Sequence, residues 1–240
     1  MGWLSRTALL IGEDGIRGLQ KSRVIVFGLG GVGSFSAEAL IRAGIGCLTI
    51  VDHDVIELSN LNRQLVATRS SLGIPKVEAM RERLQDINPG AQIIPIRSKV
   101  SCDNIHEFLE QKIDYVVDAI DDVNAKVAII KACRDRDVPV VSAMGTGNRF
   151  DPTKFRVVDI SDTHTCPLAR AVRSLLRKAG ILSGVKVVLS AEQPLKVVGR
   201  TPGSISFVPP VAGMVLASVV VRDLLGRDLP GGDQIESQPI

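Results

Sequence analysis

Apolar residues occur in short runs of strand length that alternate with longer helical patterns along most of the chain. The strand-like runs cover residues 24–27, 48–51, 93–96, 115–117, 138–142, 155–160 and 185–189. Helical spacing of apolar residues covers 34–43, 75–87, 126–134, 168–179 and 211–225, and 104–111 has the pattern of a short helix. This alternation predicts an α/β fold with a doubly wound, mostly parallel sheet and an apolar C-terminal helix. Pro95 suits an edge strand, because proline has no N–H to donate to a neighbouring strand.

A glycine-rich turn joins the strand at 24–27 to the helix at 34–43. Its glycines are Gly28, Gly30, Gly31 and Gly33. Glycine lets the backbone turn sharply and approach a phosphate, and the N–H groups and dipole at the start of a helix bind anions. Asp52 ends the next strand, where an acid accepts hydrogen bonds from ribose hydroxyls. These features predict a nucleotide site; the alternative is a turn that only packs the helix against the strand.

A second polar cluster follows Asp52 and distinguishes between kinds of nucleotide. It consists of Asp54, Glu57, Asn60, Asn62 and Arg63, and Lys76 comes shortly afterwards. An NAD-dependent oxidoreductase does not need this cluster. Triphosphate chemistry does, because cations offset the phosphate charge and a carboxylate can hold Mg²⁺. Lys76 stands near the start of a helix, where its charge is unfavourable unless an anion compensates it, so we interpret it as a phosphate ligand.

Together these motifs resemble the adenylating enzymes of the ubiquitin-activating (E1-like, ThiF-type) superfamily over nearly the whole chain. The matching segments are 28–33 with its doubled glycine, Asp52-His53-Asp54-Val55, Ser59–Gln64, Gly73–Glu78, Ile87-Asn88-Pro89 and Asp118-Ala119-Ile120-Asp121. Asp151-Pro152-Thr153 and the segment Cys166–Arg170 look most like the tRNA threonylcarbamoyladenosine dehydratases. That family uses ATP to activate the carboxylate of a modified adenosine beside the anticodon and closes it into a cyclic form through a carboxyl-adenylate.

The resemblance also implies cofactors, partners and residue roles. It implies ATP with Mg²⁺, a homodimer, a tRNA carrying threonylcarbamoyladenosine, and a sulfur-relay partner of the cysteine desulfurase type. The residues that would contact the nucleotide are Asn60, Asn62, Arg63 and Lys76, and Asp121 would hold Mg²⁺. The alternative role for Asp121 is to cap the N-terminus of the following helix, but Asp122 or Asn124 could take that role instead. Arg6 would reach across the dimer to the partner's ATP, or is a solvated arginine near the N-terminus. The alternative reaction is activation of the C-terminus of a sulfur-carrier or ubiquitin-like protein; a non-catalytic scaffold is disfavoured by the intact charged motifs.

The region 151–206 is expected to face the substrate. Arg170, Arg173 and Arg177 recur at helical spacing, so they share a face that either follows tRNA phosphates or is solvated. Cys166 is a candidate nucleophile, although a buried structural cysteine is commoner, and His164 is a candidate acid or base. The loop at 191–206 is a candidate lid over the substrate. Aromatic residues make up 3% of the chain, so an RNA site here would depend on phosphate contacts.

Composition sets limits on these interpretations. The 240 residues, 45% of them hydrophobic, can form one domain over 1–226, with 1–18 as a docking arm of one short helix and a loop, and 227–240 as a disordered tail. A net charge of +3 does not by itself argue for nucleic acid. The four cysteines are far apart in the sequence, so no zinc site is expected. Without a signal peptide or a membrane-length apolar run, we expect a cytoplasmic protein.

Overall fold

In the computed structural model, which describes residues 2–199 and 201–226, seven strands form one sheet in the order β3-β2-β1-β4-β5-β7-β6. The strands are β1 (Arg23–Phe27), β2 (Cys47–Val51), β3 (Gln92–Ile96), β4 (Tyr115–Asp118), β5 (Val140–Ala143), β6 (Phe155–Asp159) and β7 (Lys186–Ser190). The helices are α1 (Ser5–Lys21), α2 (Gly33–Ala43), α3 (Lys76–Ile87), α4 (Val123–Asp135), α5 (Pro167–Lys178) and α6 (Val208–Leu224). The predicted tail at 227–240 lies outside the described residues.

The sheet is parallel except for β6, which pairs antiparallel with β7. The chain builds β1, β2 and β3 outward in one direction and then returns to place β4 and β5 on the other side of β1. The winding direction therefore reverses between β1 and β4. Open α/β sheets bind ligands at such a reversal, beyond the carboxyl ends of the strands. The prediction of a doubly wound, mostly parallel sheet is confirmed.

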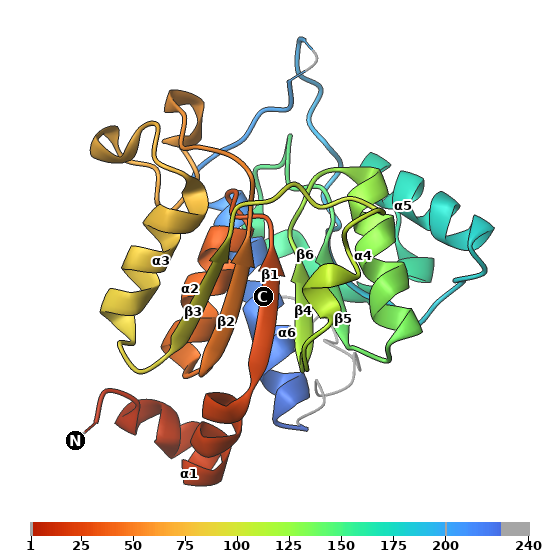
Figure 1. The fold of residues 1–240 in the computed structure, drawn as a ribbon. Coiled ribbons are helices and arrows are strands. Elements are labelled where there is room, and N and C mark those ends of the chain that lie inside the picture. The colour runs from red at the N-terminus through yellow and green to blue at the C-terminus, as the bar shows by residue number, and fades with distance from the viewer. Residues whose placement is uncertain (1, 200, 227–240) are drawn as a thin grey trace, which may run out of the picture.

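Successive residues of the buried strands alternate between two cores. In β1, Val24 and Val26 belong to one core, with α2, α3 and α6, whereas Ile25 and Phe27 belong to the other, which includes α4 residues. A third cluster joins α4 to α5. Both faces of the sheet are thus covered (Figure 1), which explains why these strands read as continuous apolar runs in the sequence.

Three details differ from the sequence prediction. The N-terminal segment is helical from Ser5 to Lys21 (α1), apart from a kink at Gly12 (φ 75°, ψ 167°). The prediction of a short helix followed by a loop is therefore wrong. Segment 104–111 contains a three-residue 3₁₀ turn, Glu107–Leu109, in place of a helix, because so short a segment gains few hydrogen bonds for its nucleation cost. Helix α6 begins at Val208, with prolines in its first turn, where their missing N–H groups cost nothing. The edge position of β3, which contains Pro95, is confirmed.

Candidate functional site

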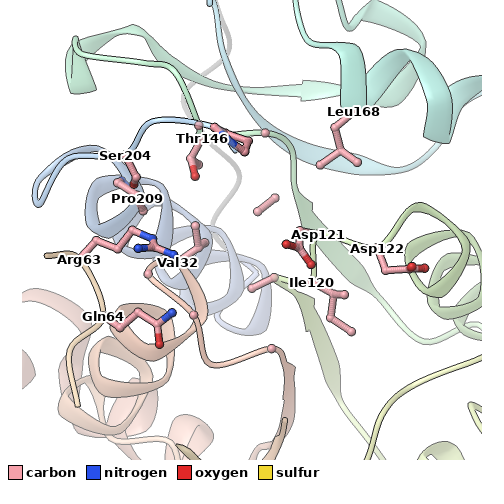
Figure 2. Close-up of a pocket in the computed structure, with 18 of the residues that line it drawn as sticks. Val32, Arg63, Gln64, Ile120, Asp121, Asp122, Thr146, Leu168, Ser204 and Pro209 are labelled. Atoms are coloured by element: carbon pink, nitrogen blue, oxygen red, sulfur yellow. The ribbon is translucent and has the colours of Figure 1, made fainter. Parts of the chain in front are cut away.

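A cleft of about 1120 Å³ lies at the carboxyl ends of the strands, where the winding reverses. Figure 2 shows Arg63 and Gln64 on one side of the cleft, Asp121, Asp122 and Leu168 on the other, and Thr146 with Ser204 on a third. The cleft brings together nearly all the predicted nucleotide residues: Gly28, Gly30, Gly31, Asp52, Asn60, Asn62, Arg63, Lys76 and Asp121. Gly33 begins α2 directly behind this surface.

The glycines of the 28–33 turn have two different roles. A Cβ on Gly33 would lie 1.8 Å from the carbonyl oxygen of Gly28, and Gly28 itself has φ +86°, so both positions require glycine for packing and conformation. A Cβ on Gly30, in contrast, would meet only the Gln64 side chain, at 4.0 Å. Packing therefore does not require glycine at position 30, and close approach of a ligand to the backbone there stays a prediction.

Helix α6 supports this turn from behind. A Cβ on Gly213 would lie 2.2 Å from the carbonyl oxygen of Val32, and a Cβ on Gly31 would lie 3.0 Å from Pro209. The start of α2 thus packs closely against the N-terminal half of α6, with the backbone of Gly213 against the carbonyl of Val32. This contact fixes the N-terminus of α2 toward the cleft, where its N–H groups and dipole favour an anion.

Asp52 links the glycine turn to the segment that follows β2. One carboxylate oxygen accepts from the Leu29 N–H at 2.6 Å, and the other accepts from the Asp54 N–H at 2.8 Å. The residue is buried but lines the cleft. Asp52 therefore has a structural role, and its contact with ribose stays a prediction.

Lys76 is buried at the first position of α3 and forms an ion pair with Asp54, with Nζ 2.7 Å from Oδ2. Partial burial acts to raise the pKa of Asp54, but the hydrogen bond and charge of Lys76 outweigh it and hold that pKa below its ordinary value. The anion that the helix start requires is thus present within the chain. Lys76 also lines the cleft, and its contact with a ligand phosphate stays a prediction.

The segment 58–64 forms one wall of the cleft and is held in place by hydrogen bonds. Asn60 caps its 3₁₀ turn by accepting from the Glu57 N–H at 3.1 Å. Arg63 donates to the Ser59 carbonyl and the Asn62 side chain, both at 2.9 Å. Asn62 in turn donates to the Ser204 carbonyl at 3.0 Å, which ties this wall to the loop at 191–206. Arg63 is thereby held in place with its guanidinium at the cleft.

Asp121 and Asp122 follow β4 and have different roles. Asp122 caps α4 by accepting from the Ala125 N–H at 2.8 Å, so the N-cap role belongs to Asp122, one of the two residues that the sequence offered for it. Asp121 is exposed on the cleft (Figure 2). Its carboxylate is free of the capping role and is suited to a cation beside a bound phosphate.

A fully buried cluster beneath Asp121 was missed in the sequence. Lys126 Nζ lies 2.9 Å from Asp118 Oδ2 and 3.1 Å from Ser142 Oγ, and the Ser142 hydroxyl donates to Asp118 at 2.6 Å. The other oxygen of Asp118 accepts from the Ile120 N–H at 3.2 Å. The cluster joins β4, β5 and α4 and fixes the turn that presents Asp121. The sequence did contain a signal for the burial of Lys126, because this residue lies at helical spacing on the same face of α4 as Ile129, Ile130 and Cys133.

The predicted substrate residues are not all brought to the cleft. Cys166 lines it, is buried, and caps α5 by accepting from the Ala169 N–H, which favours the structural alternative. His164 is exposed and does not line the cleft. Arg170 and Arg177 are exposed on α5, whereas Arg173 is partly buried and donates to the carbonyl and hydroxyl of Thr163. The predicted arginine face is therefore reduced to Arg170 and Arg177.

The described residues of the loop at 191–206, which are 191–199 and 201–206, lie along the cleft and contribute Pro194, Thr201, Pro202, Gly203 and Ser204 to it. Its two sides are joined through Asn148, whose carbonyl accepts from Leu195 and whose N–H donates to Gly203, both at 2.8 Å. In Figure 1 the loop rises beyond the ends of the strands, at the opposite end of the sheet from α1 and its Arg6. Arg6 is exposed and does not line this chain's own cleft.

Metal-binding and membrane features are limited in the part of the chain that the structure describes. There, one cluster of potential metal ligands occurs, Asp52, His53 and Asp54, whose ligand atoms lie within 4.8 Å of one another. The four cysteines are free. No described helix has both the length and the hydropathy needed to cross a bilayer.

The doubly wound sheet and the glycine-turn cleft at its reversal define a nucleotide-binding α/β protein. The chain belongs to the ThiF family, whose profile matches residues 4–237. It is 43% identical over 238 residues to the tRNA threonylcarbamoyladenosine dehydratase of Bacillus subtilis (strain 168), which covers 92% of this chain and 94% of that relative. It is 40% identical over 171 residues to the protein of the same name from Escherichia coli (strain K12), covering 71% of this chain and 64% of that protein.

Solved structures agree with this assignment. E. coli tRNA N6-threonylcarbamoyladenosine dehydratase in complex with ATP matches with a TM-score of 0.88 at 35% identity, over 93% of both chains. Its complex with AMP matches with a TM-score of 0.89, also at 35% identity, over 92% of this chain and 93% of that one. The resemblance found in the sequence is confirmed.

Proposed function

We propose that the protein is an ATP-dependent tRNA threonylcarbamoyladenosine dehydratase. The proposal rests on the cleft, because four groups line one surface there. They are the unobstructed backbone at Gly30, the hydrogen-bonded guanidinium of Arg63, the buried Lys76 and the exposed Asp121. These groups suit a triphosphate. The similarity to dehydratases over most of the chain supplies the substrate class.

In the proposed reaction, a carboxylate oxygen of the modified adenosine attacks the α-phosphorus of ATP and pyrophosphate leaves. An internal nucleophile of the modified base then attacks the acyl carbon, and AMP leaves with the former carboxylate oxygen. The turn at 28–33 and α2 bind phosphates, Asp52 holds ribose, and Asn62, Arg63 and Lys76 hold the phosphate chain. These residues act by orientation and by stabilising developing charge.

Isotope labelling tests this reaction directly. tRNA carrying threonylcarbamoyladenosine with ¹⁸O in its carboxylate should yield pyrophosphate, ¹⁸O-labelled AMP and a nucleoside lighter by one water. Label-free AMP would contradict acyl-adenylate formation. A small protein ending in Gly-Gly, tested in parallel, should not stimulate pyrophosphate release; stimulation by that protein alone would assign the chain to carrier-protein activation.

Mg²⁺ is the proposed metal at Asp121. The exposed carboxylate on the cleft fits a hard cation that prefers oxygen ligands, and when bound it would offset charge on the triphosphate. Asp121→Asn should keep the fold and lower turnover at least about tenfold. Steady-state kinetics over a Mg²⁺ series measures this. Asp122→Asn is the matched control, because its amide oxygen can still cap α4, and it should keep turnover near the wild-type value. Normal turnover of Asp121→Asn at saturating ATP and Mg²⁺ would place the metal on another residue.

The exposed arginines of α5 are the proposed tRNA contacts. If Arg170 and Arg177 touch phosphates, each Ala variant should reduce the slope of log K against log salt by about 0.7 to 0.9, because one fewer counterion is released. Arg173→Ala should instead lower thermal stability, because it removes the bonds to Thr163. Filter binding of modified tRNA over a salt series measures the slope. An unchanged slope in the Arg170→Ala/Arg177→Ala double variant would show a solvated helix face.

Dimerisation and a sulfur-relay partner complete the proposal, with the enzyme acting in the cytoplasm. Support for the dimer comes from α1, where Leu9 is 87% and Leu10 is 78% exposed, beside an exposed Trp3. An arm of this kind suits docking onto a second copy, which would bring Arg6 toward the partner's nucleotide.

A further inference from the structure

Three cationic side chains are buried among the described residues, and they differ in their partners. Lys76, Lys126 and Arg149 are 5%, 0% and 4% exposed. Lys76 is paired with Asp54 and Lys126 with Asp118. Arg149 forms no ion pair within the described part of the chain. A buried guanidinium stays protonated, and a buried charge without a counterion is costly, so Arg149 stands out from the other two.

The residues around Arg149 hold its side chain in place but supply no counterion among the described residues. One terminal nitrogen donates to the main-chain carbonyl of Glu192, while Nε is buried without a hydrogen-bond partner among the described residues. The Glu192 carboxylate is occupied by the N–H groups of Phe150 and Asp151, both at 3.0 Å. Asn148 is bonded to the loop at 191–206. The segment on both sides of Arg149 is therefore fixed before a ligand arrives.

Arg149 lines the same cleft as the nucleotide residues but comes from a different part of the fold. It follows β5, together with Thr146 and Asn148, and the neighbouring lining residues Cys166 and Leu168 begin α5. Arg63 and Lys76, the proposed phosphate ligands, come from the segments after β2. The cleft thus has a second basic position on the side that is not used by the glycine turn.

We infer that Arg149 binds the carboxylate of the modified adenosine and places it against the α-phosphate of ATP. This inference rests on the proposed dehydratase function. A carboxylate and a triphosphate repel one another, so their close approach needs a cation between or beside them. One terminal nitrogen of Arg149 is bonded to the Glu192 carbonyl and Nε has no partner among the described residues, so the Nε edge of the guanidinium provides the fork that matches a carboxylate. Its fixed position supplies the orientation that adenylation requires.

The test compares two anticodon stem-loop RNAs that differ only in the charge of the modification. One carries threonylcarbamoyladenosine, and in the other its carboxylate is converted to the primary carboxamide. Binding is measured to the full-length protein loaded with α,β-methylene ATP, which cannot release pyrophosphate. The wild-type protein should bind the carboxylate RNA about tenfold or more tightly than the carboxamide, as for one charge-assisted hydrogen-bonded pair.

Arg149→Met should bind both RNAs equally, whereas its affinity for the ATP analogue should be unchanged. In turnover, the KM for tRNA should rise more than kcat falls. Arg149→Lys keeps the buried charge without the fork, so it should retain part of the preference and serves as the second variant. Arg156→Met, an exposed arginine on β6 outside the cleft, is the matched control and should behave like wild type.

The inference is overturned if the wild-type protein does not distinguish the two RNAs, a result that needs no variant to fold. It is also overturned if Arg149→Met keeps the preference, and a loss of ATP-analogue affinity in that variant would then assign Arg149 to the nucleotide phosphates. Failure of the proposed function gives a different result, because the wild-type protein would then form no cyclic nucleoside from the carboxylate RNA and ATP.

Discussion

Replacing Lys76 by Met should slow pyrophosphate release from ATP about a hundredfold or more while the chain stays folded. Preorganised charge at the reacting group is worth this much when one donor is removed from a water-poor site. Met fills a volume similar to the lysine stem, and the abandoned Asp54 carboxylate is 49% exposed, so water can solvate it. The loss should therefore appear in turnover and hardly at all in the free energy of unfolding.

Two variants separate the proposed phosphate contact from other effects of Lys76→Met. Asp54→Asn breaks the same ion pair but keeps the cation, so it should slow the reaction much less. Lys131→Met removes an exposed lysine of α4 and should leave the rate unchanged. Steady-state pyrophosphate release and urea denaturation provide the two measurements. If Asp54→Asn slows the reaction as much as Lys76→Met, the ion pair is the important feature and the phosphate contact is not.

Replacing Lys126 by Met should lower the free energy of unfolding by about 3–5 kcal/mol, the cost of breaking a buried ion pair by removing one partner. Both Lys126 and Asp118 have fully buried side chains, so the remaining carboxylate cannot be solvated in place. Burial first, and then the charge of Asp118, raise the pKa of Cys133 to about 12. The Cys133 thiol beside Asp118 therefore stays neutral.

The double variant Lys126→Met/Asp118→Asn tests this explanation. It removes both charges, and the amide introduced at position 118 can still bond to Ser142 and to the Ile120 N–H. Replacing a whole buried pair is often close to neutral, so the double variant should recover most of the lost stability in urea denaturation. A double variant as unstable as Lys126→Met would show that packing of the lysine stem, and not charge, sets the cost.

Patterns within short segments of the sequence were sufficient to predict the sheet and one wall of the cleft. The strands and helices follow from apolar runs and helical spacing, and the glycine turn, Asp52, Arg63, Lys76 and Asp121 follow from motifs that are contiguous in the sequence. The antiparallel direction of β6 was not predicted, because strand direction depends on pairing with β7, far along the chain. The prediction of a helix at 104–111 was wrong, because apolar spacing does not account for the nucleation cost of so short a helix.

The residues that sequence reasoning missed depend on long-range contacts. Lys126 becomes significant only when β4 and β5 bring Asp118 and Ser142 to it. Arg149 has no periodic or motif signal, and its burial comes from Glu192 and the loop at 191–206. The N-cap of α4 was narrowed to Asp122 or Asn124 from the sequence, but the choice of Asp122 required the geometry of the turn.

The contact between Gly213 and the carbonyl of Val32 has a consequence for the synthesis of the chain. The ribosome releases the glycine turn well before α6, which packs against it. Domains generally fold as units while they emerge, so a nascent chain that stops before Val208 has the glycine turn without the helix that packs against it. ATP cannot stabilise such a fragment by mass action. Nucleotide binding is therefore acquired only after α6 has been made.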